Sequence, residues 1–225
     1  MTSPLPRFYL ISPGLHGQGH ELVRAAEVAF EAGARMLQVR EPQLLDGPLT
    51  ELVRALLEVA ARYDARLVLN AGKGAGLRVA RKLKLPVHLD ASWPVSGVRR
   101  ELQGMLVGAS AHTPMEVAQA AAARADFLQL SPLLEARPGA QVPPMGLETL
   151  SALSRKVPLP LYVMGGVGPE QVPTVLQAGA YGVAARTTVF FETRVTGNGS
   201  EEAGALVDLE QLSKRVNAYV EALSS

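Results

Sequence analysis

The chain has 225 residues, a formal net charge of +1 and no cysteine. This charge balance provides no long-range field for nucleic acid or an anionic membrane, so we expect neither as a partner. The lack of cysteine excludes disulfides, thiolate metal sites and cysteine nucleophiles. The N-terminus has no signal-peptide core and no long apolar span occurs, which predicts a soluble, cytoplasmic protein.

Hydrophobic residues make up 48% of the chain and charged residues only 19%. This content predicts extensive burial, either on both faces of a parallel sheet or partly between copies of the chain, so a homo-oligomer stays open. Barrels commonly reach this length as one unit, and we expect a single domain over residues 1–225.

Eight short apolar runs recur along the chain, each typical of a strand that is covered on both faces. They span residues 8–12, 35–40, 66–70, 86–90, 105–110, 127–131, 160–166 and 182–186. Between them lie stretches with apolar residues at helical spacing, as in 21–30 and 49–63. Eight such units without a break in composition predict an α/β fold, the (β/α)8 TIM barrel.

Two segments interrupt this pattern. Residues 132–146 follow the sixth strand and contain Pro138, Pro143 and Pro144, which predicts an active-site loop. Residues 194–204 contain a Gly-Asn-Gly-Ser sequence and are predicted as a mobile surface loop before a C-terminal helix that ends near Leu223.

Polar residues end several of the predicted strands, and in this fold the reactive groups lie at the carboxyl ends of strands. Gln38 and Arg40 end the second strand, Asn70 the third and Ser110 the fifth, and we predict that these four bind substrate. Arg40 can form two parallel hydrogen bonds to a carboxylate or a phosphate. Glu41 should point to the opposite face, because side chains alternate along a strand.

A phosphate site is predicted at the last two strands. Gly165 and Gly166 end the seventh strand, and Pro169 suits the first turn of a helix after it. Thr187 and Thr188 follow the eighth strand in a predicted loop. Loops after strands seven and eight bind phosphate in many such barrels. A plain tight turn is the alternative explanation of the glycine pair.

His112 is the candidate acid/base residue. Thr113 and Pro114 after it are typical of a helix N-cap and a first helical position, which places His112 at the barrel mouth. Histidine side chains can accept and release protons near neutral pH. A structural histidine is the alternative, and the sequence shows neither a Ser-His-Asp triad nor a metal-ligand cluster.

Several short motifs occur together in a characteristic order. They are Gln38-Val39-Arg40-Glu41, Leu69-Asn70, Val87-His88-Leu89, Gly108-Ala109-Ser110-Ala111-His112-Thr113, Gly146-Leu147-Glu148 and Gly165-Gly166-Val167. In this order and spacing, over about residues 8–192, the chain resembles the thiamine-phosphate synthase/TenI superfamily. Members of that superfamily are barrels that act on thiazole phosphates.

The resemblance departs from the synthase branch at the groups that hold pyrophosphate and Mg²⁺. The lysine of the synthase Gln-x-Arg-x-Lys motif is Pro42 here, and the aspartate after the third strand is Ala71. The position of the synthase's second aspartate, a few residues after the fourth strand, is Trp93 here, and Asp90 lies three positions earlier. The lysine of the loop after strand six has only Arg137 nearby, in a shifted position.

The retained residues imply the TenI-type branch, a metal-independent thiazole tautomerase that aromatises carboxythiazole phosphate. In that branch the histidine at the position of His112 transfers the proton, and no cofactor is required. One alternative is a thiamine-phosphate synthase that joins hydroxymethylpyrimidine pyrophosphate to thiazole phosphate and needs Mg²⁺. The others are a catalytically silent barrel that binds a thiazole or thiamine phosphate, and a sugar-phosphate isomerase with Asp90 or Glu41 as its base.

Overall fold

Eight parallel strands hydrogen-bond to one another in chain order, and β8 pairs with β1 to close a barrel. Each of the eight predicted runs overlaps one observed strand, which confirms the (β/α)8 TIM barrel as a single domain. The strands are β1 (Phe8–Ile11), β2 (Met36–Val39), β3 (Arg66–Asn70), β4 (Val87–Leu89), β5 (Val107–Ala111), β6 (Phe127–Leu130), β7 (Leu161–Val163) and β8 (Gly182–Ala185).

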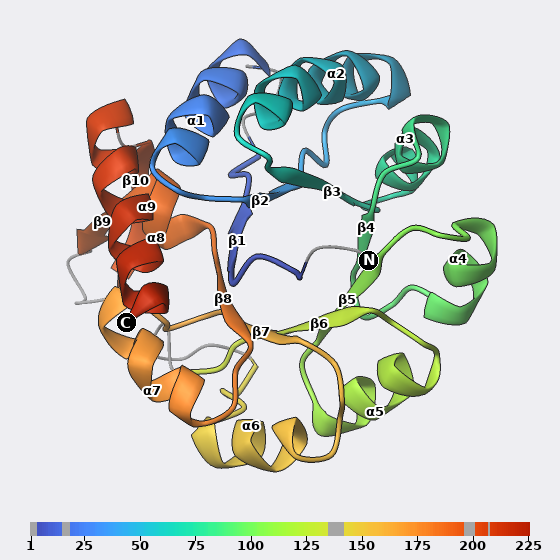
Figure 1. Cartoon of the computed structure of the whole chain (residues 1–225), viewed down its shortest axis with the longest axis vertical. Coiled ribbons are helices and arrows are strands. Elements are labelled where there is room, and N and C mark those ends of the chain that lie inside the picture. The colour runs from blue at the N-terminus through green and yellow to red at the C-terminus, as the bar shows by residue number, and fades with distance from the viewer. Residues whose placement is uncertain (1–3, 15–18, 135–141, 196–200, 207) are drawn as a thin grey trace.

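Helices surround the barrel (Figure 1). The computed structural model describes residues 4–14, 19–134, 142–195, 201–206 and 208–225. The helices up to β8 are α1 (Gly19–Glu31), α2 (Asp46–Arg62), α3 (Ala75–Leu83), α4 (Val95–Glu101), α5 (Pro114–Ala122), α6 (Leu147–Ser154), the 3₁₀ turn η1 (Pro169–Gln171) and α7 (Val172–Gln177). The chain ends with α8 (Thr187–Phe190), the strands β9 (Phe191–Val195) and β10 (Glu201–Leu206), and α9 (Leu209–Ser224).

The strands carry two apolar faces because successive side chains point to opposite sides of the sheet. In β1, Phe8 and Leu10 pack against the surrounding helices, whereas Tyr9 and Ile11 point into the barrel. The barrel interior is filled by one small cluster of buried side chains: Tyr9, Ile11, Met36, Val68, Phe127, Tyr162 and Ala184. The interior is therefore a packed core and not an open pore.

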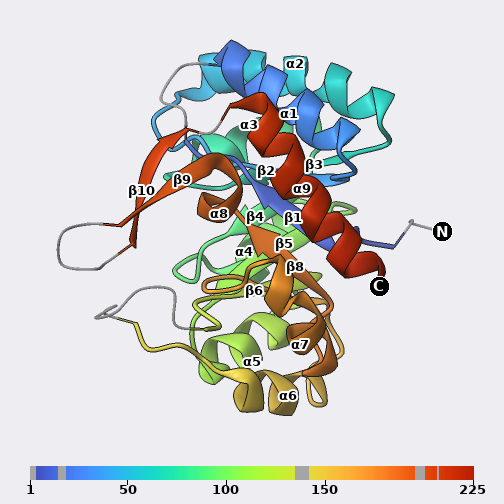
Figure 2. The same cartoon turned by 90° about the vertical axis from the view of Figure 1, so that its left-hand side faces the viewer.

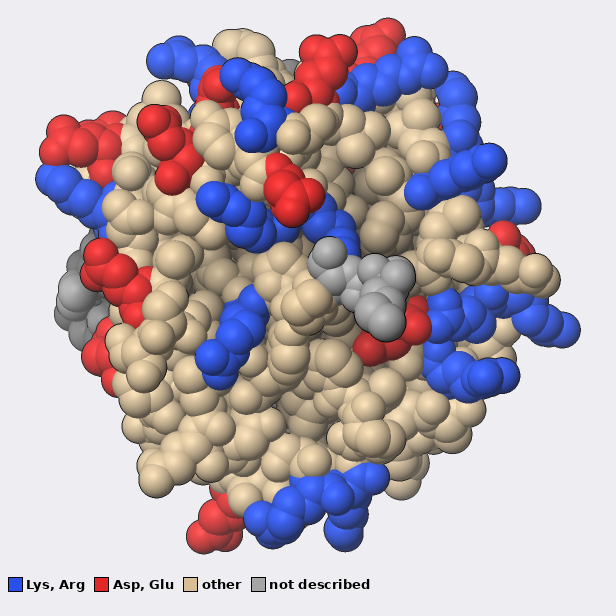
Figure 3. Space-filling model, in the orientation of Figure 1, with Lys and Arg blue, Asp and Glu red and all other residues tan. Residues whose placement is uncertain are grey.

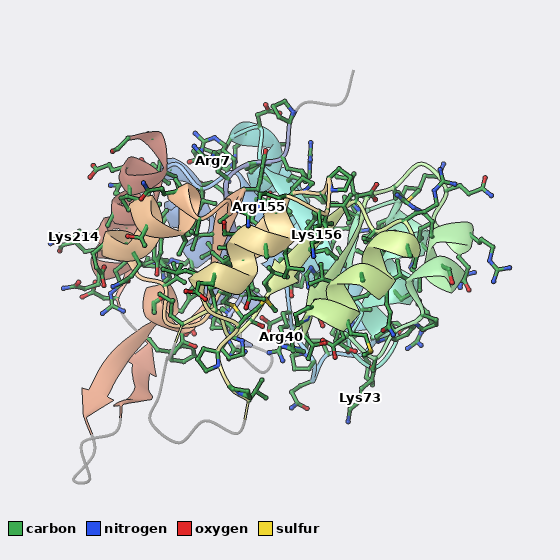
Figure 4. All side chains as sticks on the ribbon, turned by 90° about the horizontal axis from the view of Figure 1, so that it is seen from below. Arg7, Arg40, Lys73, Arg155, Lys156 and Lys214 are labelled. Carbon is green, nitrogen blue, oxygen red and sulfur yellow. The ribbon has the colours of Figure 1, made fainter. Side chains whose placement is uncertain are left out.

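The two ends of the barrel differ. At the amino-terminal end, residues 4–7 are held by the Tyr162 hydroxyl, which donates to the Pro6 carbonyl (2.6 Å), and by the Tyr181 hydroxyl, which donates to the Leu5 carbonyl. Figure 4 shows Arg40, which follows β2, on the opposite side of the molecule from this end. The chemistry expected at the carboxyl ends of the strands is thus far from the N-terminal segment.

The prediction of a loop over residues 194–204 is wrong at both ends of that range, where the chain forms strands. β9 and β10 pair antiparallel, with Val195 opposite Glu201 and Arg194 opposite Glu202. Figure 2 shows this hairpin projecting from the barrel on the side away from the N-terminus. Residues 196–200 lie outside the described residues. The error arose because both strands contain charged residues and lack the continuous apolar run by which the barrel strands were predicted.

The proline-rich segment agrees with its prediction as far as it is described. Residues 132–134 and 142–146 form neither helix nor strand. Residues 135–141, including Arg137, lie outside the described residues. The predicted active-site role of the segment stays a prediction.

The surface carries charges of both signs. Figure 3 shows acidic and basic side chains next to one another at several places on one face. Exposed pairs include Arg62 with Glu27 (2.7 Å) and Arg81 with Glu101 (3.3 Å). Among the helices of the described ranges, none is both long and apolar enough to cross a membrane.

Gly108 leaves room for a ring in the barrel interior. A Cβ atom at this position would lie 2.2 Å from the Phe127 ring, and that ring is confined by Tyr9 and Tyr162. We expect Gly108→Ala to lower the free energy of unfolding by about 1–3 kcal/mol, because overpacking forces the ring cluster apart. Gly47→Ala is the control: no atom lies within 4 Å of its added Cβ, and α2 should keep or gain stability. Urea unfolding measures both, and equal stabilities would contradict the packing argument.

Candidate active site

Five polar side chains from five successive strands form a hydrogen-bonded line inside the barrel. Asn70 Nδ2 donates to Gln38 Oε1 (3.0 Å), and Gln38 Nε2 donates to Tyr9 Oη (2.8 Å). Tyr9 Oη lies 3.2 Å from His88 Nδ1, and His88 Nε2 lies 2.9 Å from Ser110 Oγ. The structure therefore brings together three predicted substrate-binding residues and adds Tyr9 and His88, which were not predicted as site residues.

His88 is fully enclosed in the barrel interior. Its ring packs beside the rings of Tyr9 and Phe127, with centroid distances of 5.8 and 5.9 Å. Burial lowers the pKa of His88 to about 3, against the smaller opposing effect of the Asp90 carboxylate. His88 is thus a neutral imidazole in the folded protein at physiological pH.

His112 lies at the mouth of the barrel, exposed, directly before α5. The predicted cap is confirmed: Thr113 accepts a hydrogen bond from the Glu116 backbone N–H, and Pro114 begins the helix. The Nδ1 atom of His112 is hydrogen-bonded to the Ser131 carbonyl oxygen. Because a carbonyl only accepts, Nδ1 carries the proton, and the Nε2 atom of the neutral ring has a lone pair for an incoming proton.

Arg40 is half-buried just beyond the end of β2. Its backbone N–H donates to Ser12 Oγ (2.8 Å), and Ser12 Oγ donates to the buried carboxylate of Glu41 (2.7 Å). The Glu41 carboxylate thus contacts Ser12, at the end of the neighbouring strand β1. The Arg40 guanidinium forms no ion pair within 4.0 Å with any residue of the described ranges.

Gly165 and Gly166 adopt left-handed backbone angles, with φ of +88° and +67°. The loop after β6 packs directly on them: the Leu134 N–H donates to the Gly165 carbonyl (3.0 Å). A Cβ on Gly166 would lie 2.9 Å from the Leu134 backbone. Local geometry therefore already requires both glycines, and their predicted contact with phosphate stays a prediction. Within the described ranges the Gly166 N–H donates to no protein acceptor.

Thr187 and Thr188 were predicted in a loop, but they begin the short helix α8. One turn of helix is too short to show a period in sequence. The Thr188 hydroxyl lies 3.0 Å from Tyr219 Oη, and Tyr219 donates to the Val167 carbonyl (2.8 Å). Tyr219 in α9 therefore ties the segment after β7 to α8, and the Thr188 hydroxyl is used in that contact. The Thr187 hydroxyl has no such partner among the described residues.

The described residues do not fit a Mg²⁺ site. No group of three His, Asp or Glu side chains suited to a metal occurs among the described residues. Asp90 Oδ1 accepts hydrogen bonds from the backbone N–H of Ser92 (3.0 Å) and from its hydroxyl. The position after β3 is the buried Ala71. Mg²⁺ prefers carboxylate oxygens, and the described part of this end of the barrel offers few of them.

Gln129 is a further polar residue that the sequence analysis did not predict, because it lies inside an apolar run. It neighbours Ser110 in the strand register and shares its face of the sheet with Phe127, which points into the barrel. Its Nε2 lies 3.7 Å from Met164 Sδ, and its buried Oε1 has no hydrogen-bond donor among the described residues. The carboxyl end of the barrel thus holds an unpaired acceptor beside Ser110.

Trp93 and Asp90 lie on the segment that follows β4. Trp93 Nε1 donates to the Gly72 carbonyl (3.3 Å), which connects the segments after β3 and β4. Both residues line a cleft that also includes Ser110 and Glu116. The cleft therefore adjoins one end of the hydrogen-bonded line.

Comparison with known proteins gives consistent matches over most of the chain. The TMP-TENI family model, described as thiamine monophosphate synthase, matches residues 8–189. A thiamine-phosphate synthase of Anaeromyxobacter dehalogenans is 35% identical over 165 residues, 72% of each chain. One of Methanoculleus marisnigri is 31% identical over 196 residues, 84% of this chain and 89% of that protein. The solved structure of thiamine phosphate pyrophosphorylase from Pyrococcus furiosus has a TM-score of 0.77 at 20% identity, covering 97% of this chain and 95% of that one.

The buried neutral His88 should make stability depend on pH. An unfolded chain protonates this histidine below a pKa of about 6.5, whereas the folded chain protonates it only near the pKa of about 3. Between these values the unfolded state binds one more proton. The free energy of unfolding should therefore fall, as pH is lowered, by about 1.4 kcal/mol per pH unit from this group alone.

Urea unfolding at several pH values inside this window measures the slope. His88→Gln should reduce the slope by the contribution of one proton, about 1.4 kcal/mol per pH unit. His20→Gln, which changes an exposed histidine, should leave the slope unchanged. NMR titration of the His88 ring in the unaltered chain provides a second measurement if the His88 variant does not fold. A folded-state pKa near 6.5 would show that the imidazole is not desolvated.

Proposed function

Since the chain belongs to the thiamine monophosphate synthase (TMP-TENI) family, we propose that it is a thiamine-biosynthesis enzyme that acts on a thiazole phosphate, as a thiazole tautomerase. The observation that carries this proposal is the orientation of His112. Its Nδ1–H is held by the Ser131 carbonyl, so its Nε2 is available as a base at the exposed mouth of the barrel. Proton transfer is the chemistry that such a group provides without a metal.

The reaction is an isomerisation in which one proton changes place. His112 Nε2 removes the proton from C2 of the carboxythiazole ring, and the electron pair of that C–H bond shifts into the ring. The same proton, or one exchanged with water, is delivered to the exocyclic carbon, where a new C–H bond forms. One imidazole can serve both steps when both carbons lie within its reach.

The other predicted residues would bind the substrate around that step. Arg40 suits the carboxylate, because its guanidinium is not neutralised by a described ion pair and can form two parallel hydrogen bonds. The N–H of Gly166 and the Thr187 residue, at the ends of β7 and β8, suit the phosphate. Ser110 would contact the ring.

The names of the relatives favour a second candidate, thiamine-phosphate synthase. That reaction releases pyrophosphate, whose growing negative charge needs neutralisation. The Mg²⁺ ligands implied by the family resemblance are not matched here, since Ala71 replaces one aspartate and Asp90 bonds to Ser92. We therefore place the synthase second.

The test is an isomerisation assay on the full chain with the carboxythiazole phosphate tautomer, in EDTA, followed by the absorbance change on aromatisation. We expect turnover that His112→Ala lowers by about 10² to 10⁴, the usual contribution of an acid/base group. His20→Ala, which removes an exposed histidine of α1, should keep the full rate and is the matched control.

The other outcomes separate the alternatives. No turnover in EDTA, together with Mg²⁺-dependent condensation of hydroxymethylpyrimidine pyrophosphate and thiazole phosphate, would assign the synthase. Tight binding of thiazole phosphate or thiamine phosphate, with neither reaction, would assign the silent binder. A His112→Ala variant as fast as the unaltered chain would refute the proposed base.

A further inference from the structure

The hydrogen bonds of the interior line run in one direction, and a backbone group fixes where they start. The Gly72 N–H donates to Asn70 Oδ1 (3.1 Å). A backbone N–H can only donate, so this contact orients the Asn70 amide and leaves its Nδ2 to donate to Gln38 Oε1 (3.0 Å). The Gln38 amide is then oriented too, and its Nε2 donates to Tyr9 Oη (2.8 Å).

The direction continues through Tyr9 and His88. Tyr9 Oη already accepts from Gln38, and its own proton points to the neighbouring acceptor, His88 Nδ1, at 3.2 Å. An imidazole that accepts at Nδ1 carries its single proton at Nε2. His88 therefore donates from Nε2 to Ser110 Oγ at 2.9 Å.

The Ser110 hydroxyl ends this line: it accepts a hydrogen bond from His88, and its own proton is donated to no described residue. Its Oγ receives the His88 proton, and no described residue accepts a hydrogen bond from its hydroxyl. The side chain is half-buried at the carboxyl end of β5, two residues before His112. The Ser110 hydroxyl is thus poised to donate to an acceptor atom of a ligand that lies against His112.

We propose that Tyr9 and His88 are positioning residues that hold Ser110 as a hydrogen-bond donor to an acceptor atom of the substrate. This inference rests on the proposed function for the identity of that atom, an oxygen of the substrate carboxylate. Removal of the C2 proton spreads negative charge into the carboxylate on that carbon, and a donor fixed beside one of its oxygens stabilises the charge as it develops.

The tautomer of His88 decides whether Ser110 can do this. With its proton at Nδ1, the His88 ring would present a lone pair to Ser110 from Nε2, and the serine hydroxyl would turn to donate to it. The substrate would then face an oxygen lone pair in place of a proton. Tyr9 disfavours this tautomer, because with a proton on His88 Nδ1 the Tyr9 hydroxyl would have no acceptor for its own proton among the described residues.

A double-mutant cycle on kcat tests the inference, with Tyr9→Phe and Ser110→Ala. Each single change should lower kcat about tenfold, the size of one lost neutral hydrogen bond, with little effect on KM. The double variant should be no slower than Ser110→Ala, because Tyr9 acts only through Ser110. If the kcat losses of the two single variants multiply in the double variant, Tyr9 and Ser110 act independently, and the proposal is overturned.

Tyr162→Phe is the matched control. This ring also lies in the barrel interior and contacts Tyr9, but its hydroxyl donates to the Pro6 carbonyl at the amino-terminal end. The same chemical change should therefore leave kcat unaltered and should add nothing to the effect of Ser110→Ala. A tenfold loss of kcat in Tyr162→Phe would show that removal of any buried hydroxyl lowers kcat through packing, and it would contradict a specific role of Tyr9.

Nitrogen NMR of His88 in the full, unaltered chain provides a readout that does not depend on turnover. The signal can be assigned by replacing the other three histidines in turn. We expect the proton at Nε2, and a proton at Nδ1 would overturn the inference. The Nε2–H form without isomerase activity would leave the positioning role standing while the proposed function fails. Isomerase activity together with the Nδ1–H form would support the proposed function and overturn the positioning role.

Discussion

A neutral imidazole is enclosed inside this barrel with a hydrogen-bond partner at each nitrogen, and the arrangement of the mouth depends on it. A buried polar group left without its partner costs about 1–3 kcal/mol. Tyr9 on β1 must therefore reach across the interior to His88 on β4, and Ser110 on β5 must lie on the other side of the ring. These contacts exist only when the barrel is closed in its observed register.

The sequence predicted the strands because a strand covered on both faces must be apolar almost throughout, and eight such runs are visible. Gln38, Asn70 and Ser110 were found because polar residues at the ends of such runs are conspicuous. Tyr9 and Gln129 were missed because they lie inside the runs, where alternation between the two faces carries no visible signal. Their importance follows from neighbours on other strands; Tyr9 and His88 are 79 residues apart.

The region after β8 was predicted least well, for a related reason. α8 is one helical turn and too short to show a period, and β9 and β10 contain charged residues and lack the continuous apolar run of the barrel strands. The Thr188 hydroxyl was expected to be available for phosphate, but it is bonded to Tyr219, a residue 31 positions later. A terminal helix that packs back on the first strand could not be placed from local sequence. The stacking of Phe8 on Tyr219 shows how it is anchored.

Burial assigns opposite chemistry to the two histidines of the mouth. His88 points into the barrel, and desolvation lowers its pKa to about 3, so it acts as a fixed dipole and cannot exchange protons near neutral pH. His112 lies in solvent two residues beyond Ser110, and only its Nδ1 side is held, by a backbone carbonyl of the neighbouring segment. Its other nitrogen can accept a proton from a ligand and return it. In the proposed reaction, His88 would orient Ser110 and His112 would transfer the proton, so neither imidazole would have to leave its hydrogen bonds.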